Sequence, residues 1–316
     1  ILVGIGGHRG RGKSTLTRAF YELLGHDRVT TLCLDDYHSL DRRERALVGV
    51  TPLNPRANNF ALMEEQLWAL KRGEVIAKPV YDHADGTFKA PELVAPNEVV
   101  IVQGLHPFLS PGIRQAFDLK VWLDPETELR ITWKLQRAVA KRGYHESEVR
   151  AELEAGRADA EAHIHTQRVH ADLVVRFSAP TPHHAAAAMG HLNVRLTQRH
   201  SLPRLDFEQA LDNGTTVRLH LDVDDEDGCR ADILDIAGRI SDADAAQIDG
   251  AVWHHASARH HHLHPPRHQE LGTYDQPRGS PPRDPLGPPQ FITAHRTPRR
   301  QQRILRRAKA DHYPTI

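Results

Sequence analysis

Short apolar runs alternate with amphipathic segments over the first 180 residues. The runs are rich in β-branched residues, which is typical of strands buried inside a parallel sheet. They occupy residues 1–5, 28–36, 99–102, 119–123 and 172–177. The amphipathic segments predict helices after the first run, within 54–73, from about 130 to 142 and within 145–168. Strands that alternate with helices in this way predict an α/β fold, with a mostly parallel sheet covered by helices on both faces.

The pattern changes after residue 180. Two further runs, 216–222 and 231–236, predict antiparallel strands joined by an acidic turn, and a helix is predicted from about 242 to 254. The following segment is rich in histidine, proline and arginine. It has too few apolar residues to offset the entropy cost of ordering, so we expect it to be largely disordered. The predicted organisation is an α/β domain over 1–180, a small α+β extension over 190–254 and a tail over 255–316.

Charge and cysteine content narrow the class of protein. The chain has 41 Lys and Arg residues and 41 Asp and Glu residues, so its formal net charge is zero. No long-range field therefore favours nucleic acid or an anionic membrane as a partner. No apolar run approaches the roughly 20 residues that span a bilayer. The two cysteines, Cys33 and Cys229, form no disulfide framework and indicate a reducing cytoplasm.

The strongest local motif follows the first strand. Gly7, Gly12, Lys13 and Ser14 complete the phosphate-loop pattern G-x-x-x-x-G-K-[ST]. Glycines let successive N–H groups converge on one anion at the positive end of the next helix, so ATP and Mg²⁺ are the expected ligands. The expected nucleotide-binding residues are Gly7, His8, Arg9, Gly10, Arg11, Gly12, Lys13, Ser14 and Thr15. The alternative is a glycine turn with an incidental Lys-Ser, but the flanking strand and helix are what the motif requires.

Other candidate chemistry lies near the ends of predicted elements. Asp35 and Asp36 end the second strand; they are either a general base and a metal-binding acid, or an ordinary exposed turn. Arg137 and Arg142 form either a lid that caps the γ-phosphate or a solvated helix face. The histidine cluster over 254–264 matches no metal-binding spacing, and we expect its histidines to be structural or adventitious.

Four further segments carry a family resemblance: 34–42, 53–60, 78–81 and 104–107. Together with the phosphate loop they resemble the phosphoribulokinases, especially the plant and cyanobacterial branch of the phosphoribulokinase/uridine kinase family. The resemblance covers residues 1 to about 177. It implies a P-loop NTPase-type kinase fold and a Calvin-cycle reaction, in which the γ-phosphoryl group of ATP is transferred, with Mg²⁺, to ribulose 5-phosphate. A homo-oligomer is expected.

The resemblance also implies roles for individual residues. Asp35 would take the proton of the acceptor hydroxyl, with Lys13 and Arg137 completing the catalytic set. Arg142 would contact the nucleotide. The sugar-phosphate site would contain His38, Arg42, Tyr81, His83 and Lys134. The metal would be held by Ser14, Asp36 and Gln103.

The chain departs from the family pattern at several of these places. The family has Glu where this chain has Gln103, Asp where it has Ala138, and, in the plant branch, Lys where it has Ala46. The loss of two carboxylates near a divalent ion predicts weakened turnover. A uridine kinase-like nucleoside kinase and a non-catalytic ATP-binding relative therefore remain as alternatives. The plant enzymes have a regulatory disulfide between a phosphate-loop cysteine and a cysteine at the position of Cys33. This chain has Arg11 at the phosphate-loop position, so we expect no redox control.

Overall fold

The computed structural model describes residues 1–8, 12–142, 145–180, 192–202, 217–224, 228–238 and 240, without the side chains of 136–142 and 219–222. The helix predicted near 242–254 and the predicted tail lie outside these residues. Within them, no helix combines the length and the apolar character needed to cross a membrane.

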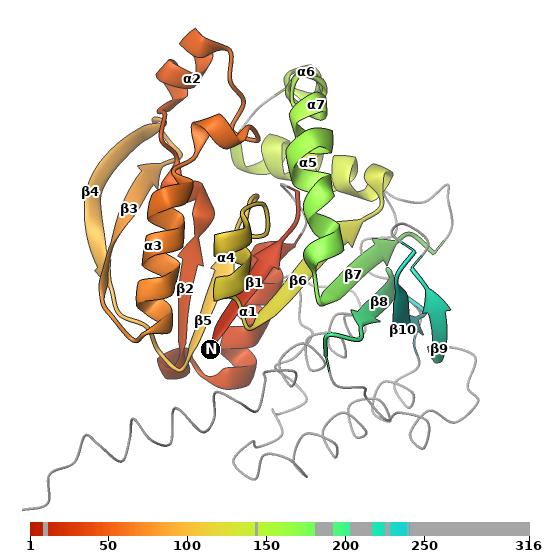
Figure 1. Cartoon of the computed structure of the whole chain (residues 1–316). Coiled ribbons are helices and arrows are strands. Elements are labelled where there is room, and N and C mark those ends of the chain that lie inside the picture. The colour runs from red at the N-terminus through yellow and green to blue at the C-terminus, as the bar shows by residue number, and fades with distance from the viewer. Residues whose placement is uncertain are drawn as a thin grey trace, which may run out of the picture.

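One eight-stranded sheet forms the centre of the molecule, in the order β2-β5-β1-β6-β7-β8-β10-β9 (Figure 1). Its strands are β1 (Leu2–Gly6), β2 (Val29–Cys33), β5 (Val99–Gln103), β6 (Leu119–Pro125), β7 (Leu173–Ser178), β8 (Asn193–Arg199), β9 (Val217–Val223) and β10 (Arg230–Ile236). The first five in spatial order are parallel, and β8, β10 and β9 continue the sheet antiparallel. The predicted parallel sheet is therefore confirmed over its larger part.

The strands predicted for the C-terminal extension continue the same sheet, while the division into domains stays a prediction. The sequence predicts that the run over 172–177, which is β7, is the last strand of the core. In the structure, residues 193–198 of β8 pair with residues 173–178 of β7, and β10 pairs with β8. The antiparallel pair β9–β10 is confirmed, yet it belongs to the same sheet as the phosphate loop. The physical reason is that the outer edge of β7 carries unpaired backbone groups, which β8 satisfies. The expected boundary near residue 180 therefore does not separate two sheets.

Two hydrophobic clusters cover the two faces of the sheet. Because successive strand residues point to opposite faces, β1 contributes Val3 and Ile5 to one cluster and Leu2 to the other. The first cluster is completed by residues of α1 (Lys13–Leu24) and α5 (Thr127–Arg142), and the second by residues of α3 (Phe60–Lys71) and α4 (Pro111–Ala116). Helices on both faces are thus confirmed.

The remaining elements cover the carboxyl ends of the parallel strands or lie beside them. They include the short helix α2 (Arg42–Val48), the helices α6 (Glu146–Ala155) and α7 (Arg157–Asp159), and a separate hairpin of β3 (Ile76–Asp82) and β4 (Thr87–Val94) (Figure 1). A π-helical turn, Ala160–Ile164, and a 3₁₀ segment, His165–His170, connect α7 to β7. The sequence indicates a loop or short hairpin over 78–86; the structure shows a longer hairpin there. The second apolar run ends earlier than predicted, since β2 stops at Cys33 and a 3₁₀ turn, Leu34–Tyr37, follows.

Candidate active site

The phosphate loop connects β1 to α1. Gly12 precedes α1 with φ +77°, in the left-handed region, and a Cβ there would meet no atom within 4 Å. Glycine is therefore required at this position by backbone conformation and not by lack of space. The Lys13 ammonium donates hydrogen bonds to the carbonyls of Gly7 and His8, both at 3.0 Å. It bridges the start of the loop to its end, while Arg9, Gly10 and Arg11 lie outside the described residues.

Gln103 lies at the end of β5, between the ends of β2 and β1. It is in register with Cys33 on one side and with Ile5 on the other. The hydroxyl of Thr17, one turn into α1, donates to the Lys13 carbonyl at 2.9 Å and lies 3.4 Å from the Gln103 amide oxygen. The structure therefore brings Gln103 beside the first turn of α1, where Ser14 is exposed and Thr15 is half-buried.

Asp35 follows β2 at the same edge of the sheet, in the 3₁₀ turn, and is half-buried. The charges of Asp35 and of Lys13 in the phosphate loop both affect the pKa of the nearby Cys33 thiol. Burial, and after it the negative charge of Asp35, raise the pKa of the Cys33 thiol to about 12, while the positive charge of Lys13 acts in the opposite direction. Cys33 thus lies within electrostatic reach of the predicted base and of the phosphate-loop lysine.

Asp36 has a different environment from the one expected of a metal ligand. One of its carboxylate oxygens lies 2.6 Å from the Lys78 ammonium, and the other accepts the backbone N–H of Tyr81 at 3.2 Å. Lys78 also lies 2.9 Å from Glu92 of the neighbouring strand. Burial acts to lower the pKa of Lys78, but its hydrogen bonds to Asp36 and Glu92 outweigh burial and raise it. Both oxygens of Asp36 thus have partners on the β3–β4 hairpin, and its predicted role as a metal ligand stays a prediction.

Most of the predicted sugar-phosphate residues come together where α2 meets this hairpin. The ring of Tyr81 packs edge-on against His38, with centroids 4.9 Å apart, and against His83, with centroids 5.1 Å apart. The Arg42 guanidinium donates to the carbonyls of His83, at 2.6 Å, and Ala84, at 3.3 Å. Two segments about 40 residues apart in the chain thus form one cationic and aromatic cluster, which we call the α2–hairpin cluster (His38, Arg42, Tyr81 and His83).

The fifth predicted sugar-phosphate residue, Lys134, lies elsewhere, on the helix that carries the predicted lid residues Arg137 and Arg142. Lys134 is on α5, and its ammonium lies 3.5 Å from Glu152 of α6. The side chains of Arg137 and Arg142, on the same helix, are outside the described residues. Their predicted role stays a prediction.

Two residues that support the α2–hairpin cluster were not identified from the sequence. Arg45 is buried; it donates to the Tyr81 hydroxyl at 2.8 Å and to the Leu40 carbonyl at 2.6 Å. Asn58 is buried as well, and its amide oxygen lies 2.9 Å from Nδ1 of His38. The available signals were weak: Arg45 stands one helical turn after Arg42, and Asn58 belongs to the 53–60 segment.

A second set of hydrogen bonds fixes the 53–60 segment over the site. Thr51 and Asn54 both bond to the carboxylate of Asp159 in α7, at 2.5 and 2.9 Å. The Leu53 carbonyl lies 2.8 Å from Nε2 of His106, in the loop that follows Gln103. Segments that are far apart in the chain are therefore held together around the ends of β2 and β5.

The side chains at this edge of the sheet offer oxygen atoms that suit Mg²⁺, although these atoms carry little negative charge. Ser14 offers a hydroxyl, Gln103 a neutral amide oxygen and Asp35 a carboxylate, and Mg²⁺ is commonly bound by few protein oxygens together with water and substrate phosphates. Among the residues that the structure describes, no group of three or more His, Cys, Asp or Glu side chains is arranged to hold a metal ion. Because Asp36 is paired with Lys78, the net negative charge at this edge is small.

Comparison with known proteins agrees with this geometry. The model of the phosphoribulokinase/uridine kinase family matches residues 2–181. A phosphoribulokinase from Synechocystis is 42% identical to this chain over 217 residues, which cover 69% of this chain and 65% of the relative. A chloroplastic phosphoribulokinase from Mesembryanthemum crystallinum is 36% identical over 235 residues, which cover 69% of this chain and 59% of the relative. The chain thus spans less than two thirds of the length of these relatives. A solved phosphoribulokinase structure from Rhodobacter spheroides shares the fold, with TM-score 0.59 and 16% identity, covering 82% of this chain and 97% of that one.

Proposed function

Because the chain belongs to the phosphoribulokinase/uridine kinase family, we propose that it transfers the γ-phosphoryl group of ATP to ribulose 5-phosphate, giving ribulose 1,5-bisphosphate. The observation that carries this proposal is the α2–hairpin cluster. It places two imidazoles, a guanidinium and a phenol ring next to the turn that contains Asp35. Cationic and hydrogen-bonding groups in this arrangement suit a phosphorylated sugar better than an uncharged nucleoside.

In the proposed reaction the phosphate loop holds the nucleotide. Lys13 would release the carbonyls of Gly7 and His8 and turn to the β- and γ-phosphates, while backbone N–H groups contact their oxygens. When bound, Mg²⁺ would neutralise negative charge on those oxygens. Ser14 and Gln103 are the protein groups proposed to hold it.

The two neighbouring carboxylates would have different tasks. Asp36 binds Lys78 and the Tyr81 N–H, so it fixes the hairpin against the end of β2. We therefore assign the base to Asp35, which would take the proton of the attacking hydroxyl. The sugar phosphate would be bound by the α2–hairpin cluster, and the arginines of α5 would cap the transferring group.

A non-catalytic ATP-binding protein is the second candidate, and Gln103 favours it. A neutral amide beside the phosphate loop cannot balance the charge of a divalent ion as a carboxylate would. Phosphoryl transfer depends largely on positioning and on charge neutralisation, so this replacement lowers turnover while leaving nucleotide binding nearly intact.

A coupled assay of ADP release separates these candidates. The wild type is incubated with ATP and Mg²⁺ and with ribulose 5-phosphate, with uridine or with neither. The proposal expects ADP release that depends on ribulose 5-phosphate and is lost in Asp35→Asn, with product identified by mass spectrometry. Release with uridine instead contradicts the proposed acceptor. Intact ATP binding without turnover on either acceptor, even at high enzyme concentration, establishes the second candidate.

A further inference from the structure

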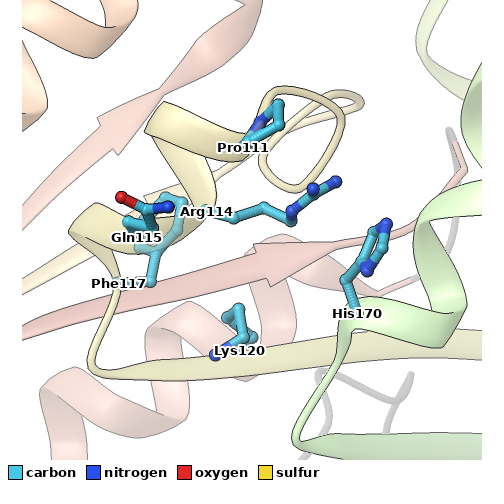
Figure 2. Close-up of a pocket in the computed structure, with 6 residues that line it drawn as sticks. All are labelled: Pro111, Arg114, Gln115, Phe117, Lys120 and His170. Carbon is cyan, nitrogen blue, oxygen red and sulfur yellow. The ribbon is translucent and has the colours of Figure 1, made fainter.

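A pocket lies at the amino end of β6, whereas the candidate active site lies at the carboxyl ends of the parallel strands; Figure 2 shows the residues that line the pocket. It has a volume of 320 Å³ and is lined by Pro111, Arg114, Gln115, Phe117, Lys120 and His170. Its residues come from α4, from the amino end of β6 and from the turn before β7. The phosphate loop follows the carboxyl end of β1, which is parallel to β6. Since a five-residue strand is about 16 Å long, the pocket is separate from the site already described.

The pocket carries more positive than negative charge. The Arg114 guanidinium donates to the carbonyls of Phe108 and Leu109, at 2.9 and 3.2 Å, and has no carboxylate partner among the residues that the structure describes. Lys120 forms an ion pair with Asp172 at 2.8 Å. One of the two lining cations is therefore neutralised and the other is not. Arg114 uses one of its nitrogens on the carbonyls, and a guanidinium has five N–H donors in all.

The pocket is also lined by His170, which is half-buried. Figure 2 shows the Arg114 side chain extending toward this imidazole. Burial lowers the pKa of His170, and so do the positive charges of Arg114, Arg199 and Lys120. After burial, the positive charges of Arg114, Arg199 and Lys120 thus act on the imidazole, and the same charges favour an anion in the pocket.

We propose that this pocket binds a phosphate dianion, either inorganic phosphate or the phosphate group of a small monoester, between Arg114 and Lys120 with a hydrogen bond from His170. Arg114 offers a positive charge that no carboxylate of the described residues pairs with, and the Lys120 ammonium has three N–H donors, more than its contact with Asp172 needs. Charge-assisted hydrogen bonds of this kind are the strong ones. The volume is at the lower end of the roughly 300–1,000 Å³ range of small-molecule pockets, which suits a short phosphate ester. Phe117 and Pro111 provide apolar walls for its carbon atoms.

The test uses Lys13→Ala as the parent protein, because this substitution removes the phosphate-loop lysine that would otherwise bind the same anions. Inorganic phosphate and glycerol 3-phosphate are titrated separately by calorimetry at constant ionic strength, which removes general screening effects. Gln115 provides a matched pair of variants, since it lines the pocket and is exposed on α4. Gln115→Glu adds a negative charge beside the anion, and Gln115→Lys adds a positive one.

We expect saturable binding in the parent, at least tenfold weaker binding in Gln115→Glu and equal or tighter binding in Gln115→Lys. For the binding that the Gln115 substitutions alter, a higher affinity for glycerol 3-phosphate identifies a monoester as the ligand class, and a higher or equal affinity for inorganic phosphate identifies the free anion. Arg114→Gln should also bind at least tenfold more weakly. If that variant fails to fold because Phe108 and Leu109 lose their donor, the Gln115 pair still decides. Absence of saturable binding in the parent, or equal affinities in Gln115→Glu and Gln115→Lys, overturns the proposal.

Discussion

The hydroxyl of Thr17 lies 3.4 Å from the amide oxygen of Gln103, which joins the first turns of α1 to the end of β5. The same hydroxyl donates to the Lys13 carbonyl at 2.9 Å, so the longer contact is the weaker of the two. Position 103 is therefore directed at the amino end of α1, where the phosphates and Mg²⁺ are proposed to bind. A carboxylate here would carry negative charge toward both the ion and the positive helix end.

Gln103→Glu is predicted to raise kcat. The shape of the side chain and its acceptor for Thr17 are retained, and one negative charge is added beside the proposed ion. We expect kcat for ribulose 5-phosphate to rise at least about tenfold, which corresponds to ~1.4 kcal/mol in the barrier. The Mg²⁺ concentration for half-maximal rate should fall. Steady-state assays across a Mg²⁺ titration measure both quantities.

The matched control for this change is Gln103→Ala, which removes the oxygen without adding charge and should lower kcat further. Adding Ala138→Asp to Gln103→Glu restores the second family carboxylate and should raise kcat again. Rates equal to wild type for the single and double variants would show that the missing carboxylates do not limit this protein.

Lys13→Ala is predicted to abolish stabilisation by nucleotide. Its ammonium closes the loop through Gly7 and His8, and it is the cation proposed to contact the β- and γ-phosphates. Saturating ATP should raise the Tm of the wild type by several degrees and leave that of the variant unchanged, as measured by differential scanning fluorimetry. The control is Arg18→Ala, on the exposed face of α1, which should respond to ATP like the wild type. An equal shift in Lys13→Ala would remove the basis for nucleotide binding at this loop.

Activity is predicted to be indifferent to dithiol reductants. Burial raises the pKa of the Cys33 thiol to about 12, so the thiol is protonated at pH 8 and is a poor nucleophile for disulfide exchange. Cys229 precedes β10, which is six strands away from β2. At about 4.8 Å per strand this is roughly 29 Å, whereas a disulfide needs Cα atoms within about 7 Å.

The measurement is activity after incubation with oxidised or reduced dithiothreitol, with Cys33→Ser as the control. Iodoacetamide should modify the exposed Cys229 well before Cys33, which peptide mapping detects. A several-fold rise in wild-type activity on reduction, absent in Cys33→Ser, would contradict the prediction.

Lys78→Met is predicted to destabilise the protein. The substitution keeps the apolar stem of the side chain but removes the ammonium that lies 2.6 Å from the Asp36 carboxylate. Only 7% of the Lys78 side chain is exposed, so little water can replace the lost ammonium. Removing one member of a buried ion pair costs about 3 kcal/mol. Urea denaturation of the wild type and the variant measures this loss.

The control lies on the same hairpin. Lys89 pairs with Asp82 at the surface, with 58% of its side chain exposed, so Lys89→Met should change stability little. Comparable losses for the two variants would mean that the Lys78–Asp36 pair does not anchor the hairpin as described.

Local sequence signals determined the parts of this fold that depend on neighbouring residues. The apolar run before Gly7 and the helix from Lys13 were predictable because strand burial, glycine conformation and helix periodicity are all encoded within about 25 residues. The hairpin was indicated only in outline, since its second strand is exposed along most of its length and lacks alternation. The expectation that the protein has no redox switch also required only the sequence, because Arg11 stands where the plant enzymes have the cysteine that pairs with the position of Cys33.

Tertiary structure alone decided which distant groups meet. β8 was missed because its pairing with β7 satisfies backbone groups that no local pattern records. Asp35 and Asp36 look equivalent in the sequence, but the end of β2 at Cys33 and the approach of Lys78, 42 residues later, give Asp36 a structural partner. The burial of Arg45 against Tyr81 likewise depends on where the hairpin folds back. Hydrogen bonds and ion pairs act only at contact distance, so their partners are set by the path of the chain and not by the residue types.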